Sequence, residues 1–164
     1  MEIIIEPPIT VLFILIGVVV VIIASMLLKK GDRRNKLVSL VVTVVVVAGI
    51  IFVVYRKGAI IVNETGLRTK TFGRIELAWN DVREAELLED FNSTGYGIKS
   101  KLSGIGIGEL KAGLFLLKDG SRARVVVQGS PDALLLSTDD GRFLLAPNEL
   151  PALLEEVEKY IPVR

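Results

Sequence analysis

Residues 114–146 read LFLLKDGSRARVVVQGSPDALLLSTDDGRFLLA, a series of short apolar runs broken by glycine and aspartate. The pairs Asp119-Gly120 and Asp140-Gly141 favour tight β-hairpins, because glycine tolerates a positive φ. The cluster Gly129–Asp132 marks a further reversal of the chain. This spacing predicts antiparallel strands of a small sandwich or barrel.

A helix is predicted to follow these strands. Pro147 and Asn148 offer a stop and an N-cap. Apolar residues then recur on one helical face, with charged residues on the other. The apolar positions are Leu150, Leu153, Leu154, Val157 and Ile161. We expect this helix to cover an open end of the barrel.

The segment GELKAGLFLLKDGSRARVVVQGSPDALLLSTDDGRFLLAPNELPALLEEVEKYI, residues 108–161, resembles the pleckstrin-homology-like domains of bacterial and archaeal membrane proteins. The phrase LAWNDVREAEL, residues 77–87, is similar to the one with which such domains enter an early central strand. The resemblance covers about Gly58 to Ile161. It implies a mainly β (α+β) fold, a strongly bent antiparallel barrel of about seven strands closed by a C-terminal α-helix.

Two departures limit what the resemblance implies. Eukaryotic pleckstrin-homology domains carry a tryptophan in the final helix, and none occurs there in this chain. Phosphoinositide-binding members gather basic residues around the first hairpin, where this chain has VNETGLRTK, residues 62–70. Glu64 lies at that turn, so inositol-phosphate recognition is not implied.

Acidic residues are interpreted as structural rather than catalytic. Asp119 and Asp139-Asp140 adjoin turn glycines, and aspartate stabilises such turns by bonding to its own backbone. A second acidic run predicts a solvated strand edge, since its spacing does not show the additional oxygen ligands of a cation site. That run contains Glu84, Glu86, Glu89 and Asp90.

The glycine-rich segment Asn92–Gly113 has two interpretations. It has neither a GxGxxG nor a P-loop spacing, which argues against a nucleotide site. In the first interpretation it is an edge strand whose glycines allow a bulge and a bend. In the second it presents apolar side chains to a second subunit, a partner or the membrane surface. The candidate interface residues are Tyr96, Ile98, Leu102, Ile105 and Ile107.

N-terminal to this domain, the chain has two uncharged runs, Ile9–Leu28 and Leu37–Tyr55. Each is near the roughly 20 residues with which a helix crosses a bilayer core. A lone span satisfies its own backbone hydrogen bonds only as a helix. We therefore predict a translocated tail over residues 1–8, a transmembrane helical hairpin over 9–57, and the pleckstrin-homology-like domain over 58–164.

Five basic residues lie between the two uncharged runs. Short basic loops are retained on the cytoplasmic side and attract anionic lipid headgroups. The pattern predicts a two-span protein of the cell membrane with this loop in the cytoplasm and the pleckstrin-homology-like domain outside it. The residues are Lys29, Lys30, Arg33, Arg34 and Lys36.

The composition excludes several chemistries. The chain has no cysteine and no histidine, which removes Ser-His-Asp and Cys-His catalysis and the usual zinc sites. We predict no enzyme activity, no cofactor, no metal and no nucleic-acid partner. Few methionine and glutamine residues are present, which is typical of thermophilic proteins.

The function predicted from these features is a membrane-anchored, non-enzymatic assembly or protein-interaction module. Its expected partners are membrane lipid, further copies of itself, and another membrane or envelope protein. The alternative is a membrane-attached lipid-surface sensor that uses Arg56, Lys57, Lys99 and Lys101 beside the bilayer.

Overall fold

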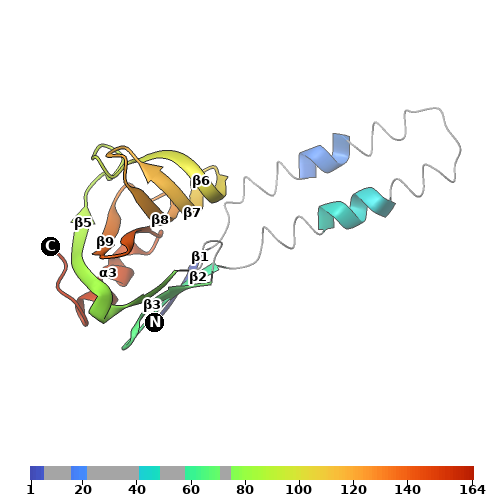
Figure 1. Cartoon of the computed structure of the whole chain (residues 1–164). Helices are drawn as coiled ribbons and strands as arrows, with labels where there is room; N and C mark the ends of the chain where they lie inside the picture. The colour runs from blue at the N-terminus through green and yellow to red at the C-terminus, as the bar shows by residue number, and fades with distance from the viewer. Residues whose placement is uncertain (6–15, 22–40, 49–57, 71–74) are drawn as a thin grey trace, which may run out of the picture. The chain divides into compact units, whose positions relative to one another are not determined.

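The computed structural model describes residues 1–5, 16–21, 41–48, 58–70 and 75–164. The chain divides into two compact units, one made of Met1–Ile5 with Lys57–Arg164 and the other of Glu6–Arg56. Figure 1 shows the strands of the first unit and the two described helical segments of the second.

The described residues of the first unit form two β-sheets. The four-stranded sheet has the order β1-β2-β3-β4, and the six-stranded sheet has the order β5-β9-β10-β8-β7-β6. The strands of the small sheet are β1 (Glu2–Ile5), β2 (Gly58–Asn63), β3 (Gly66–Thr69) and β4 (Glu76–Ala78). Those of the large sheet are β5 (Val82–Leu88), β6 (Ile98–Ile107), β7 (Leu110–Leu117), β8 (Arg122–Gln128), β9 (Ala133–Thr138) and β10 (Gly141–Ala146).

One pair of the large sheet is parallel. Strand β10 runs parallel to β8, whereas the other paired strands of this sheet are antiparallel. Direction therefore reverses at every step across the sheet except between β10 and β8. As a result, the two edge strands β5 and β6 run in the same direction.

The predicted antiparallel barrel of about seven strands is wrong. Among the residues that the structure describes, no ladder joins the two sheets, so no closed barrel forms. The chain changes sheet at a 3-10 turn, η1 (Trp79–Asp81), between β4 and β5. The indole Nε1 of Trp79 donates to the carbonyl of Asn63 at 2.8 Å, and the ring stacks on Tyr160. Both contacts hold this turn in place and interrupt the strand.

Two apolar clusters form the core. The first contains residues of both sheets and of the C-terminal helix, among them Ile60, Leu134 and Leu153. The second contains residues of the six-stranded sheet and Phe91 from the segment after β5. Residues of β8, β9 and β10 contribute to both clusters, so the large sheet is buried on both faces.

The predicted C-terminal helix is present as α3 (Leu150–Glu158), with Leu150, Leu153 and Val157 buried. The predicted N-cap at Asn148 is wrong. The cap position is Glu149, and no side chain caps the helix there. Pro151 in the first turn lacks an N–H, so the helix start has one donor fewer to satisfy.

The predicted hairpins are confirmed. The β7–β8 pair is antiparallel across Asp119-Gly120, and the β9–β10 pair is antiparallel across Asp139-Asp140, one residue before the predicted Asp140-Gly141. The carboxylate of Asp119 accepts a bond from the backbone N–H of Ser121 at 2.8 Å, as expected of a turn aspartate. Asp139 instead accepts from the guanidinium of Arg83 on β5 at 3.0 Å.

The first residues of the chain form a strand that the sequence did not indicate. Residues 2–5, which we predicted to belong to a translocated tail, pair with β2 as β1. Ile3 and Ile5 are buried in the first core cluster. The backbone of Met1 also exchanges bonds with Val62, at 2.7 and 3.0 Å.

In the second unit the structure describes helical residues 16–21 and 41–48. Among the described residues, no helix is long and apolar enough to cross a membrane. This finding contradicts the predicted two-helix transmembrane hairpin and the predicted two-span location in the cell membrane. The predicted spans cover residues 9–28 and 37–55. Apart from residues 16–21 and 41–48, they lie outside the described part of the chain.

Candidate functional site: the open edge of the large sheet

The outer edge of β6 is the longest sheet edge in the described part of the chain. Strand β6 is at the end of the six-stranded sheet and pairs with β7 alone (Figure 1). Its residues from Lys99 to Gly104 are exposed to solvent. An edge of this kind presents unpaired backbone donors and acceptors to another chain.

Glycine permits a close approach of β6 to β7. Gly104 and Gly113 lie opposite each other, both with positive φ, at 114° and 137°. A Cβ atom on Gly104 would lie 2.2 Å from the carbonyl oxygen of Ala112, and one on Gly113 would lie 2.3 Å from that of Ser103. Because the obstructing atoms are backbone, only glycine fits at either position.

Two irregularities interrupt the register between β6 and β7. They lie between Ile98 and Ser100 and between Lys101 and Ser103. The extra residues are therefore Lys99 and Leu102, as in β-bulges. Leu102 is 48% exposed. From Ser103 to Ile107 the pairing is regular.

Four of the five predicted interface residues lie on β6. Leu102 is exposed, and Ile98, Ile105 and Ile107 are half-buried. Ile98, the first residue of the strand, packs against the second core cluster, as does Tyr96 from the segment before β6. The structure therefore leaves Leu102, Ile105 and Ile107 along the open edge and places Tyr96 and Ile98 against the core.

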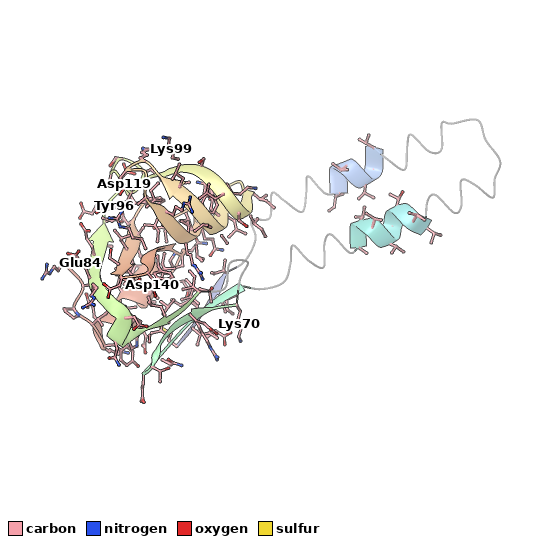
Figure 2. All side chains as sticks on the ribbon, viewed as in Figure 1. Lys70, Glu84, Tyr96, Lys99, Asp119 and Asp140 are labelled. Carbon is pink, nitrogen blue, oxygen red and sulfur yellow. The ribbon has the colours of Figure 1, made fainter. Side chains whose placement is uncertain are left out.

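A polar network fixes Tyr96. The guanidinium of Arg142 lies 5.1 Å from the centre of the Tyr96 ring and donates to Asp119 at 2.6 Å. Hydrogen bonds from Ser121, and then the bond and charge of Arg142, hold the pKa of Asp119 below its usual value. Figure 2 shows Tyr96, Asp119 and Lys99 at the same end of the large sheet.

Other candidate sites have less support than the edge of β6. The predicted basic loop lies outside the described residues; it contains Lys29, Lys30, Arg33, Arg34 and Lys36. Within the described part, no group of three or more histidine, cysteine, aspartate or glutamate residues is placed to hold a metal ion. A hollow of about 420 Å³ lies beside β3 and β4, with Arg68, Glu76 and Asp81 at its wall. It opens to solvent and has a mixed charge.

Residues 58–161 match the family model described as Bacterial PH domain. The chain belongs to this family. The match confirms the resemblance identified in the sequence, and a PH-like domain indicates a protein-interaction or lipid-binding module. No curated protein and no solved structure matches the chain.

In this bacterial PH domain the two edges of the large sheet carry opposite charge. Strand β6 carries the basic residues Lys99 and Lys101, whereas β5 carries the acidic residues Glu84 and Glu86 and one basic residue, Arg83, and so is acidic on balance. The prediction of a strand edge for the acidic run is confirmed for Glu84 and Glu86, whereas Glu89 and Asp90 lie in the turn after β5. The basic pair was not connected with it, because the order of strands in the sheet cannot be read from charge spacing.

Proposed function

We propose that the chain is a non-enzymatic bacterial PH domain that binds protein, in the first place further copies of itself, through the open edge of β6. The observation that carries the proposal is a regular edge segment, Ser103–Ile107, flanked by the exposed side chain of Leu102. Exposed apolar side chains beside unpaired backbone groups suit the addition of a strand from another chain.

The proposal is tested on the purified full-length chain by light scattering after size exclusion. We expect the wild type to form particles larger than one chain, and Leu102→Asp to reduce their mass. The matched control is Ile4→Asp on β1, because Ile4 is 51% exposed and lies on the other sheet. Circular dichroism checks that both variants keep their β signal. A monomeric wild type, or equal effects of the two variants, would refute the proposal.

A second candidate function is binding to an anionic lipid surface. Residues 98–128 contain the basic residues Lys99, Lys101, Lys111, Lys118, Arg122 and Arg124 against the acidic residues Glu109 and Asp119. Basic residues near an anionic surface each contribute about 1 kcal/mol. Flotation with phosphatidylglycerol or phosphatidylcholine vesicles tests this function. Binding should require the anionic lipid and fall in Lys99→Glu/Lys101→Glu, and equal binding to both vesicles would exclude it.

A further inference from the structure

We propose that the partner of β6 is strand β5 of a second copy, joined so that the six-stranded sheet continues from one molecule into the next. This inference rests on the proposed self-association and names the surface that completes it. Three observations support it: the rows of register partners that cross the sheet from β6 to β5, the direction of the strands, and the contacts that Arg164 makes with β5.

The first row joins opposite charges at its two ends. Successive register partners lead from Lys101 on β6 to Glu84 on β5. The row is Lys101, Phe115, Ala123, Arg142, Ser137 and Glu84. If the next copy continues the sheet in this register, its Glu84 lies opposite Lys101. Opposite charges in facing positions stabilise strand pairs, whereas like charges destabilise them.

The second row joins apolar ends. It runs from Ile105 on β6 to Leu87 on β5, through Ala112, Val126, Leu145 and Leu134. Leu87 is 38% exposed and Ile105 is half-buried. In the same register, Leu87 of the next copy covers Ile105, because the bulge at Leu102 takes up the one extra residue of β6. One register therefore satisfies both the charged and the apolar ends.

Strand direction agrees with this arrangement. Because β5 and β6 run the same way, a copy that continues the sheet pairs its β5 with β6 in parallel. The two surfaces differ, so the contact is heterologous. Such contacts build closed rings when the rotation between copies closes and filaments when it does not.

Arg164 already makes backbone hydrogen bonds to the outer edge of β5, as a strand of a second copy would. Its N–H donates to the carbonyl of Ala85 at 3.0 Å, and its carbonyl accepts from the N–H of Leu87 at 2.8 Å. Arg164 thus bonds to Ala85 and Leu87, the residues before and after Glu86. A residue in a parallel strand pair bonds to its partner strand in this way. Its guanidinium also lies 3.6 Å from the carboxylate of Glu84. Arg164 thus places a basic side chain where Lys101 of a second copy would lie.

This contact is small enough for a partner strand to replace. Within the described C-terminal segment, backbone bonds to β5 come from Arg164, and a hollow of about 350 Å³ remains beside them, walled by Val82, Ala85 and Pro162 among others. The regular part of β6, Ser103–Ile107, offers a longer run of backbone groups. Arg164 therefore competes with assembly without preventing it.

The test uses charge reversal in the full-length chain, with particle mass followed over a dilution series. Lys101→Glu and Glu84→Lys should each weaken assembly by about fivefold at every interface. The double variant should restore it, because the two exchanged charges again face each other across the contact between copies. An equimolar mixture of the two single variants should also assemble, in alternating order. Lys101 and Glu84 are at opposite edges of one molecule, so this restoration requires contact between copies.

Matched controls carry the same charge changes away from the edges. Arg122→Glu lies on the interior strand β8 and Glu158→Lys on the exposed side of α3, and neither should alter assembly. Arg164→Pro removes the N–H that bonds to Ala85 and should tighten assembly by about twofold to tenfold. Unchanged assembly in that variant would show that Arg164 does not compete with the second copy for β5.

The outcomes separate this inference from the proposed function. If Lys101→Glu weakens assembly while Glu84→Lys does not, or if the double variant stays weak, β6 has a different partner and this inference fails alone. If the wild type is monomeric, the proposed self-association fails with it.

Discussion

Replacing Gly104 by alanine should destabilise the fold of the large sheet at its open edge. The new Cβ would lie 2.2 Å from the Ala112 oxygen and 2.7 Å from the Gly113 Cα, and φ is 114°. Strained backbone and overpacking each cost about 1–3 kcal/mol, so we expect a loss of about 2–6 kcal/mol in the free energy of unfolding. Domains of this size have about 5–15 kcal/mol in total, so the loss is a large fraction.

The matched control is Gly106→Ala on the same strand. A Cβ there meets only the Lys101 side chain at 3.9 Å, and we expect a neutral effect or a gain of up to about 1 kcal/mol. Urea unfolding followed by circular dichroism compares the two variants, and amide hydrogen exchange shows whether β6 separates from β7. If Gly104→Ala unfolds at the same urea concentration as Gly106→Ala, with equal exchange, the close-approach argument is wrong.

Two further variants test the interior and the polar network. Hydrogen bonds from Ser121 and Arg142 lower the pKa of Asp119 below its ordinary 3.8. The ionised carboxylate of Asp119 therefore stabilises the fold above about pH 4, and this stabilisation is lost as the pH falls through the folded-state pKa. Asp119→Asn should therefore flatten the loss of stability measured by thermal melts on acidification, and a slope equal to the wild type's would contradict this. Trp79→Phe removes the 2.8 Å bond to the Asn63 carbonyl and should cost about 1–2 kcal/mol in urea unfolding. An unchanged midpoint would show that the bond does not hold η1 in place.

Local signals in the sequence predicted the local structure well. The pairs Asp119-Gly120 and Asp140-Gly141 mark hairpins because turn geometry depends on a few adjacent residues. The apolar spacing of Leu150, Leu153 and Val157 predicted α3 because a helix repeats every 3.6 residues. Each of these inferences needed only residues that are close along the chain.

Pairings between distant residues were not predictable in the same way. The parallel pair of β8 and β10 depends on β9 lying on the far side of β10, which no residue pattern marks. Strand β1 joins β2 across more than fifty residues, and its four residues are too few for a clear alternation. The open edge was located in part, because Leu102, Ile105 and Ile107 lie on it, whereas Tyr96 is half-buried against the second core cluster with Arg142 over its ring.

Lysines and bulges on an edge strand have a second explanation, which is protection against unwanted pairing. The two explanations differ in the sign of the charge. Protection needs only a charged side chain, so Lys101→Glu would protect β6 as well as the lysine does. Pairing with β5 needs a positive charge opposite Glu84, so the same substitution would weaken assembly and Glu84→Lys would restore it. The row that ends in Lys101 and Glu84 therefore makes charge sign the property that decides whether β6 repels other chains or selects one.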